Sequence, residues 1–595
     1  MLPTYHRHSD GAAISPSKGV RRSREKFILL MIFIAFVFVC FGAFYYVPDL
    51  KESYTKLLDG QDNNNQHQLA IPPPNANKKS IRFPPLESKK KEDKPLKHVD
   101  KEIDKEQSYN NDMNVKKGKK DMPNKDKESE KQGKVADNKS IEVKKKRDFI
   151  KKMMQHAWNG YVKYAWGSNE LRPSSLSSHS ASIFGSSMGA TIVDALDTLH
   201  IMGMHDEFKK AKDWIAKNLK FQGGGEASVF EITIRFVGGL LSAYALTKDK
   251  VFKNKAEELA DKLMPAFNTR TGIPRATINL ASGGSRNWGW AAGGSSILAE
   301  IGTLHLEFAY LSKVTGKEKY VQAVDRIRSH LNKIDKPRGL YPVYISPDSG
   351  SWVQDTVTLG ALGDSFYEYL IKSYVMSGKK DEVAKKMYYN VVESINSNMI
   401  KKSPSLGLTY LAELHGGHPS SKMDHLACFA GGMFALGGYN HPDPAKGKEQ
   451  VRLGAEITSS CHETYIKSAT RIGPEAFHFD QGNEARAIYG NEKYYILRPE
   501  TIESYFVLWR MTHDEKYRDW GWDAAQAIEK HCKAAAGYSG IRDVYTVPAQ
   551  QDDVQQSFFL AETLKYLYLL FSDDDVIPLD KWVLNTEAHP LPVDT

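Results

Sequence analysis

Apolar residues recur at every third or fourth position along most of the chain after Asp148, which is the spacing of one face of an α-helix. Runs rich in glycine or proline separate these segments, and alternating patterns typical of β-strands are short and scarce. The pattern predicts an all-α domain over residues 149–595, in which helical hairpins form a toroid around an axial cavity. Helices are expected over segments such as 149–166, 189–201, 227–246, 292–314, 319–333, 364–377, 381–398, 424–437, 450–467, 499–511, 515–531 and 556–571.

The N-terminal region has a different pattern. Residues 27–47 form an uncharged apolar run, which as a helix rising about 1.5 Å per residue can cross a hydrocarbon core of about 30 Å. Basic residues precede this run at 21–26, and a positive flank stays cytosolic. We therefore expect a cytosolic tail (1–26), a single-pass type II membrane anchor (27–47) and a luminal remainder. The alternative is a cleaved signal peptide, but the run is long and no clear small-x-small cleavage site follows it.

Residues 48–148 are rich in Lys, Glu, Asp and Asn and contain few large apolar side chains. Such a composition cannot bury enough apolar surface to offset chain entropy, so we expect a disordered luminal stem. Its lysine blocks could instead bind acidic partners or lipid, and Asn138 begins a glycosylation sequon. The net charge of +9 comes from the segments before residue 149. It therefore does not indicate a nucleic-acid partner for the main domain.

The four cysteines fit a luminal protein. Cys40 lies in the expected anchor, and Cys428, Cys461 and Cys532 lie in the helical domain. Three luminal thiols allow one disulfide and one remaining thiol, and sequence alone does not set the connectivity. We favour the pair Cys428 and Cys461 because it closes the shorter loop.

Acidic residues occur within apolar runs at several widely separated points of the chain. Each of them except Glu562 has an ordinary structural explanation. Glu231 could form an i, i+4 ion pair with Arg235, Asp364 could be a helix N-cap, and Glu500 follows Pro499 in a first helical turn. Glu562 lies within an expected helix among large apolar residues, where neither capping nor solvation explains it. Taken together, the carboxylates predict an acidic cavity in the helical shell.

Further polar groups accompany these carboxylates. Glu503 shares a helix face with Glu500, and Arg235 and Arg498 add positive charge suited to a ligand with many hydroxyls. His425 fits this set, although a structural histidine is the more frequent case. The polar run 585–590 could be only a C-terminal turn. The hydroxyl and carbonyl oxygens of its threonine can also bind a hard cation, although no EF-hand loop is present.

Several short strings are spread over the whole of residues 149–595. They are Tyr164–Gly167, Asp194–Leu199, Phe230–Arg235 followed by Gly238–Leu241, Gly363–Leu370, Arg498–Glu503, Ser557–Lys565, Phe571–Asp574 and Asn585–Pro590. In content and order they resemble the class I α-1,2-mannosidases of glycoside hydrolase family 47.

The resemblance implies an (α/α)7 barrel, a Ca²⁺ ion at its base and hydrolysis with inversion at the anomeric carbon. It implies that Glu231 is the general acid, acting through a water, and that Glu500 is the base that activates the attacking water. Asp364 matches a third catalytic carboxylate. Inversion leaves roughly 6.5–9.5 Å between the acid and base carboxyls. Thr586 matches the direct calcium ligand, and carboxylates that match those around the metal's waters and the sugar hydroxyls are Glu503, Glu562 and Glu587.

The resemblance also assigns further cavity residues and a disulfide. Residues that match glycan contacts are Arg235, His425, Arg498, Pro499 and Phe558. Glu475 matches another cavity carboxylate, and Cys428 with Cys461 matches the family disulfide.

A Leu362-Gly363 pair before Asp364 resembles the Golgi branch of the family. It implies removal of several α-1,2-linked mannoses from high-mannose N-glycans by a monomeric catalytic domain in the Golgi lumen, with the endoplasmic reticulum as the alternative. Two other classes remain, a catalytically silent glycan-binding relative and a purely structural toroid. A degradation-enhancing mannosidase-like protein is a third variant, which resembles this sequence less. Every acid, base and calcium position is filled, which favours the enzyme.

Overall fold

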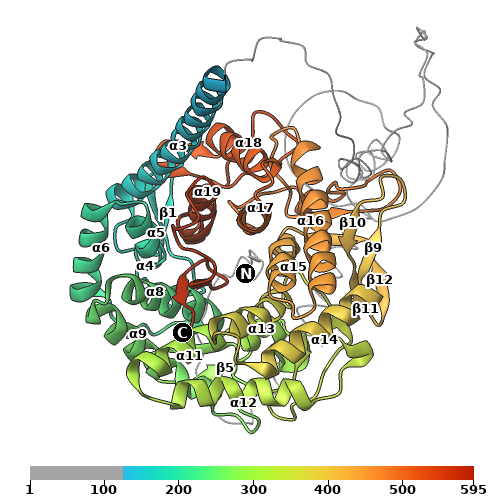
Figure 1. Ribbon diagram of the computed structural model, residues 1–595. Coiled ribbons are helices and arrows are strands. Elements are labelled where there is room, and N and C mark those ends of the chain that lie inside the picture. Colours follow the sequence, from blue (N-terminus) through green and yellow to red (C-terminus); the bar gives the residue numbers. More distant parts are fainter. Residues whose placement is uncertain (1–124) are drawn as a thin grey trace, which may run out of the picture. The chain divides into compact units, whose positions relative to one another are not determined.

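The computed structural model describes residues 125–595, with side chains from residue 140 onward. These residues form a ring of helices in two layers (Figure 1). Helices of the inner layer are buried on nearly every side; in α13, every residue is buried. The inner layer consists of α4 (Ala190–Asp194), α5 (Leu196–Ile201), α7 (Val229–Glu231) continued by the π-helix η1 (Ile232–Val237) and α8 (Gly238–Thr247), α10 (Leu298–Gly302), α11 (His305–Thr315), α13 (Asp364–Met376), α15 (Ala430–Tyr439), α17 (Glu500–Thr512), and the π-helix η7 (Phe559–Thr563) followed by α19 (Leu564–Leu570).

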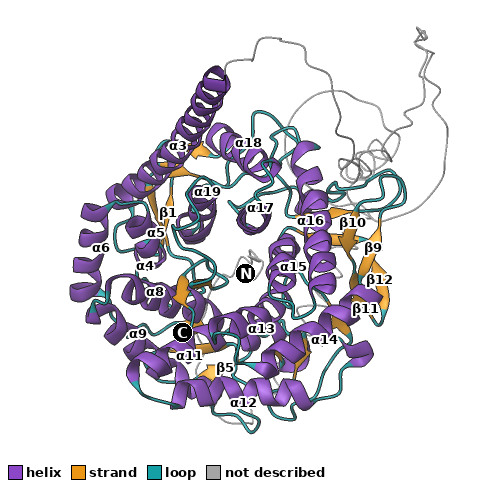
Figure 2. Ribbon diagram, viewed as in Figure 1, coloured by secondary structure: helices purple, strands orange, loops and turns teal. Residues whose placement is uncertain are grey.

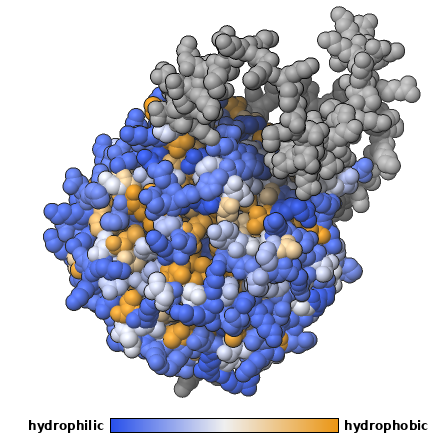
Figure 3. Space-filling view, viewed as in Figure 1, coloured by the Kyte–Doolittle hydropathy of each residue, from blue (hydrophilic) through white to orange (hydrophobic). Residues whose placement is uncertain are grey.

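Helices of the outer layer bury only one stripe. In α12 the buried apolar residues are Tyr320, Val324, Ile327 and Leu331, which recur at three-to-four spacing and face the inner layer. The other sides of the outer helices are polar. Figure 3 shows hydrophilic residues around the periphery of the face in view, with apolar side chains gathered toward its middle. The outer helices are α3 (Lys125–Tyr164), α6 (His205–Asn218), α9 (Lys250–Leu263), α12 (Lys319–Lys333), α14 (Glu382–Asn398), α16 (Pro444–Ile466) and α18 (Lys516–His531).

Inner and outer helices pack as sequence neighbours, and a final pair closes the ring. The pairs in contact are α5 with α6, α8 with α9, α11 with α12, α13 with α14, α15 with α16, α17 with α18, and α19 with α3. In the last pair an inner helix near the C-terminus packs against the first helix described (Figure 1). The predicted helical barrel is confirmed.

Short antiparallel strands lie in the connections between helices (Figure 2). Two sheets have three strands, in the orders β12-β11-β8 and β3-β4-β5, and the others are pairs. The strands are β1 (Glu170–Arg172), β2 (Ser177–His179), β3 (Glu226–Ser228), β4 (Thr277–Asn279), β5 (Ser285–Arg286), β6 (Ser296–Ile297), β7 (Tyr344–Ile345), β8 (Thr356–Val357), β9 (Ile400–Lys402), β10 (Thr409–Leu411), β11 (Glu413–His415), β12 (His418–Ser420), β13 (Lys422–Asp424), β14 (Ala476–His478), β15 (Lys533–Ala534), β16 (Gly537–Tyr538), β17 (Trp582–Leu584) and β18 (Pro590–Pro592).

The β17–β18 hairpin enters the ring and packs against α8 and α13. Its turn, residues 585–589, is built by Asn585, whose Oδ1 accepts hydrogen bonds from the backbone N–H groups of Glu587 and His589 at 2.9 and 2.8 Å. The turn approaches α8 closely at Gly238, where a Cβ atom would lie 2.6 Å from Asn585 Nδ2. A glycine is therefore required at Gly238 for the hairpin to sit this deeply.

A disulfide joins Cys428 and Cys461, with Cα atoms 6.0 Å apart. It links the 3-10 turn Leu426–Phe429, which leads into α15, to the partner helix α16. The pairing favoured from the sequence is therefore present. Cys532 is a buried free thiol.

The first helix described begins earlier than the sequence predicted. Helix α3 begins at Lys125, so residues 125–148 are helical and the expectation of a disordered stem was wrong for them. Their lysines and glutamates are good helix formers, and Glu142 and Lys146 form an i, i+4 pair at 3.2 Å. The anchor expected at 27–47 and the rest of the stem lie outside the described residues. Within the described part, one helix, Val229–Thr247, is long and apolar enough to span a membrane, and it is a buried helix of the inner layer.

Candidate active site

Residues of several inner-layer helices, and of turns beside them, surround an acidic cavity. Its free volume is about 30 Å³. Helices α13 and α17, the π-helix η7 and the turn of the β17–β18 hairpin all contribute side chains, so residues far apart in the sequence meet here. The lining residues are Ile234, Asp364, Ser365, Glu368, Leu426, Phe429, Glu500, Glu503, Glu562 and Thr586.

Glu231 ends α7, immediately before the π-helix η1 that carries Arg235. Arg235 Nε donates to Glu231 Oε2 at 2.8 Å, so the ion pair considered from the sequence is formed. The same guanidinium pairs with Glu587 and lies 3.6 Å from Asp194 Oδ2, and its carbon is 5.5 Å from the ring centre of Phe558. Arg235 is thus held by three carboxylates. Glu562 lies in the other π-helix, and such single-turn distortions frequently occur at functional sites.

Asp364 is the first residue of α13 and is buried. Its side chain caps no helix; Oδ1 accepts from the N–H of Ser365 at 2.7 Å. Burial raises the pKa of Asp364 to about 6. Leu362, two residues before Asp364, has a left-handed backbone with φ 80°.

Glu500, at the start of α17, is held by two basic side chains. His425 Nδ1 lies 2.6 Å from Glu500 Oε2, and Arg498 Nη1 lies 3.7 Å from Oε1. Burial alone would raise the pKa of Glu500, but the hydrogen bond and charge of His425 and the charge of Arg498 outweigh burial and lower it. Arg498 is fixed in turn by a bidentate contact to Glu475, at 2.5 and 2.6 Å. His425, Glu500, Arg498 and Glu475, all singled out from the sequence, are therefore connected in one chain of contacts. Pro499 is the N-cap of α17.

The remaining cavity carboxylates have too few positive partners. Burial and neighbouring carboxylates raise the pKa of Glu562 well above its usual range. Burial, opposed by Lys372, raises the pKa of Glu503 to about 8. Lys372 lies 3.7 Å from Glu503 and also pairs with Glu368, and it is the cation that these two carboxylates share. A cavity with this excess of acid groups favours a bound cation or a protonated carboxyl.

Thr586 stands at the tip of the hairpin turn, and its Oγ1 donates to Glu368 Oε2 at 2.7 Å. Two buried oxygens nearby, Glu562 Oε1 and Glu587 Oε2, have no hydrogen-bond partner among the described residues. Hydroxyl, carbonyl and carboxylate oxygens are the ligands of a hard cation such as Ca²⁺. Oxygens of this kind suit Ca²⁺, although among the described residues no group of three or more His, Cys, Asp or Glu side chains is arranged to hold a metal ion.

Sequence reasoning did not single out Glu300. It is buried in α10, its Oε1 accepts from Trp288 Nε1 at 2.7 Å, and its Oε2 has no partner among the described residues. Burial raises its pKa to about 8, with a further contribution from the charge of Glu231. The signal that could have found it is the one that marked Glu562, a glutamate in an apolar run, here Leu298-Ala299-Glu300-Ile301.

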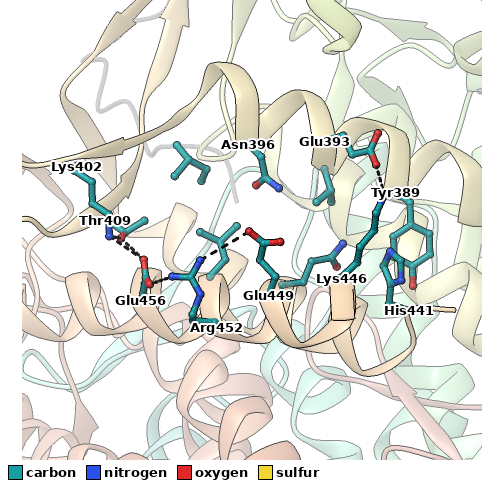
Figure 4. Close-up of a pocket in the computed structure, with 14 residues that line it drawn as sticks. Tyr389, Glu393, Asn396, Lys402, Thr409, His441, Lys446, Glu449, Arg452 and Glu456 are labelled. Carbon is teal, nitrogen blue, oxygen red and sulfur yellow. Dashed lines mark hydrogen bonds and ion pairs between the residues drawn. The ribbon is translucent and has the colours of Figure 1, made fainter. Parts of the chain in front are cut away.

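A larger surface groove lies elsewhere, between the outer helices α14 and α16 (Figure 4). Several of its carboxylates are paired; Glu393 contacts Lys446, and Glu456 contacts Lys402, at 3.0 Å in both cases. These residues are exposed or half-exposed, so the groove lacks the buried, unbalanced charge of the axial cavity.

A helical barrel with buried carboxylates around an axial cavity defines a class of carbohydrate-active hydrolase. Residues 153–593 match the model of glycosyl hydrolase family 47. The chain belongs to this family and is a glycoside hydrolase.

Individual relatives agree with the family assignment. The chain is 51% identical over 603 residues to mouse mannosyl-oligosaccharide 1,2-alpha-mannosidase IB, and the aligned region covers 96% of this chain and 93% of the mouse protein. It is 58% identical over 451 residues to the pig enzyme IA, covering 76% of this chain and 68% of the relative. Among solved structures, the α-1,2-mannosidase from Trichoderma reesei superposes with a TM-score of 0.70 at 32% identity, over 76% of this chain and 99% of that one.

Proposed function

We propose that this protein is a calcium-dependent, inverting mannosyl-oligosaccharide 1,2-α-mannosidase that removes terminal α-1,2-linked mannose from high-mannose N-glycans. The observation that carries this proposal is the pair of unlike environments within one acidic cavity. Two basic neighbours lower the pKa of Glu500, whereas Glu503 shares a single cation, Lys372, with Glu368, and the pKa values of Glu503 and Glu562 are raised. The names of the relatives at 51% and 58% identity supply the substrate.

In this proposal Glu500 is the general base. Its lowered pKa leaves an ionised carboxylate that accepts a proton from the attacking water. The water adds to the anomeric carbon as the bond to the leaving oxygen breaks, and that oxygen receives a proton from Glu231 through a second water. Asp364 is the third catalytic carboxylate, and its pKa of about 6 suits a group that exchanges protons near neutral pH.

Other residues position the sugar. We assign glycan contacts to residues around the cavity, namely Arg235, His425, Arg498, Pro499, Phe558 and Glu475. Phe558 is a buried aromatic ring beneath Arg235, which suits the apolar face of a pyranose. Thr586, with Glu503, Glu562 and Glu587 around it, would hold the calcium. When bound there, calcium supplies orientation of sugar hydroxyls and stabilisation of developing charge.

The proposal extends to architecture and location. The helix pairs of the ring correspond to an (α/α)7 barrel, closed at one end by the β17–β18 hairpin. The catalytic domain is a monomer that acts in the lumen of the Golgi, held by a type II anchor at residues 27–47. The sequence pattern of that run and Leu362 before Asp364 support this location over the endoplasmic reticulum.

Release of free mannose from a high-mannose N-glycan tests the proposal. We expect release in the presence of Ca²⁺, loss of release with EDTA, and recovery when Ca²⁺ is restored. A protein that binds the glycan but releases no mannose under any calcium concentration would be a silent glycan-binding relative, and the proposed activity would be wrong.

A further inference from the structure

Two tryptophan side chains stack on each other in the loop between β5 and β6. The ring centres of Trp288 and Trp290 lie 6.2 Å apart with an interplanar angle of 17°. Trp288 is half-buried, whereas 51% of Trp290 is exposed to solvent. Single exposed apolar residues are common, but a stacked and ordered pair of indoles presents a flat apolar surface that its own domain leaves uncovered.

The loop that carries the pair is fixed at several points. Asn287 Oδ1 accepts from the N–H of Ala276 at 2.8 Å, and its Nδ2 donates to the carbonyl of Gly294 at 2.7 Å. The N–H of Ala291 donates to the carbonyl of Trp288 at 3.1 Å. The tryptophan surface is therefore held in place before any ligand arrives, which reduces the entropy lost on binding.

Trp288 connects this surface to the acidic cavity. Its indole N–H donates to Glu300 at 2.7 Å. Glu300 lies in α10, which packs against α7, the helix that ends at Glu231. On its other side α10 meets the segment before Asp364, because the N–H of Ala299 donates to the carbonyl of Leu362 at 2.9 Å. The tryptophan pair is thus connected through α10 to the elements that carry two of the proposed catalytic carboxylates.

We propose that Trp288 and Trp290 form a binding platform for a pyranose ring of the glycan beyond the bond that is cleaved, with Trp290 supplying the exposed face. This inference rests on the proposed function. The C–H faces of a pyranose are apolar and flat, and a rigid indole buries them at a low cost in conformational entropy. Glu300, which accepts from Trp288 and is itself buried, fixes the orientation of the inner indole of the platform.

The platform predicts a difference between long and short substrates. We expect W290A to raise KM for an intact high-mannose N-glycan about tenfold, which corresponds to about 1.4 kcal/mol. For α-1,2-mannobiose, which fills only the positions on either side of the cleaved bond, the increase should stay below about twofold. W290F keeps an aromatic face and should recover most of the affinity. Direct titration of the glycan into E500Q and into E500Q with W290A should show the same loss in Kd.

Tyr439 offers a matched control. It is 69% exposed at the end of α15 and lines a groove with Arg510 and Asp580, none of which lines the acidic cavity. Y439A should leave KM unchanged for both substrates.

Two results would overturn the platform. One is a W290A enzyme with unchanged KM for the intact glycan, and the other is an equal increase for both substrates, which would indicate damage to the cavity itself. Failure of the proposed function would look different, because the wild-type protein would then release mannose from neither substrate.

Discussion

Two clusters of buried charge lie within the barrel, and they differ in the balance of acidic and basic groups. In the first, Asp197 accepts from Lys565 at 2.8 Å and contacts His589 Nδ1 at 2.7 Å, with all three side chains fully buried. Burial would raise the pKa of Asp197, but the charges of Lys565 and His589 overcome it and lower the pKa. In the cavity, Lys372 is the cation beside Glu368 and Glu503, and the pKa of Glu562 is raised.

The difference separates structure from function. A buried carboxylate whose charge is balanced by neighbouring cations requires no ligand, and breaking such a cluster should lower the stability of the fold. A buried carboxylate without them is costly unless a ligand or a reaction supplies the missing charge. Charge balance, more than burial alone, therefore marks the site.

The largest effect is expected for E500Q. The amide keeps the size of the side chain and contacts to His425 but cannot accept a proton from water, so turnover should fall about a thousandfold while the thermal midpoint changes little. Mannose release and thermal unfolding would be measured on the same preparation. E449Q, in the exposed groove between α14 and α16, is the control and should match the wild type. Turnover of E500Q within a few fold of wild type would refute its role as the base.

Lys565→Met should lower stability and leave turnover unchanged, which is the reverse of the result expected for E500Q. Removing one cation from a fully buried ion cluster leaves Asp197 undercompensated, which costs about 3 kcal/mol or more of stability. The thermal midpoint should fall by several degrees, while turnover per folded molecule at low temperature is retained. A loss of turnover without loss of stability would place Lys565 in the functional cluster and break the distinction drawn between the two clusters.

E562Q tests the unbalanced side. In EDTA, Glu562 of the wild type must take up a proton to be buried beside Glu503 and Glu587, a cost that glutamine does not have, so the variant should be more stable than the wild type by about 1–2 kcal/mol. In Ca²⁺ the order should reverse, since the wild type gains stability from the metal and the variant gains less. Thermal scans with and without Ca²⁺ measure both. Equal shifts in the two proteins would contradict a role for Glu562 near the metal.

The sequence predicted the barrel and five of the ten residues that line the cavity, because helical periodicity and acidic residues in apolar runs are local signals. Helical periodicity located the inner helices, and a glutamate in an apolar run located Glu562. Family resemblance, not spacing, assigned roles to Glu231 and Thr586. Three features were not predictable, because they depend on contacts across the fold. These are the helical start of α3 in a segment with a charged composition, the bidentate hold of Glu475 on Arg498, and the placement of Glu300 beside Trp288.

The smallest expected effect is a pH dependence that belongs to the balanced cluster. Burial opposes protonation of His589, but Asp197 and Asp194 overcome it and raise its pKa to about 9. Because the folded pKa lies above the unfolded one, this contribution to stability is complete below about pH 6.5 and is lost as the pH rises through 9. From pH 7 to pH 8 the loss should be about 1 kcal/mol. His589→Gln, less stable overall, should show a flatter profile between these values, measured as the thermal midpoint in EDTA to keep calcium out of the comparison. A variant as steep as the wild type would assign the slope to another group.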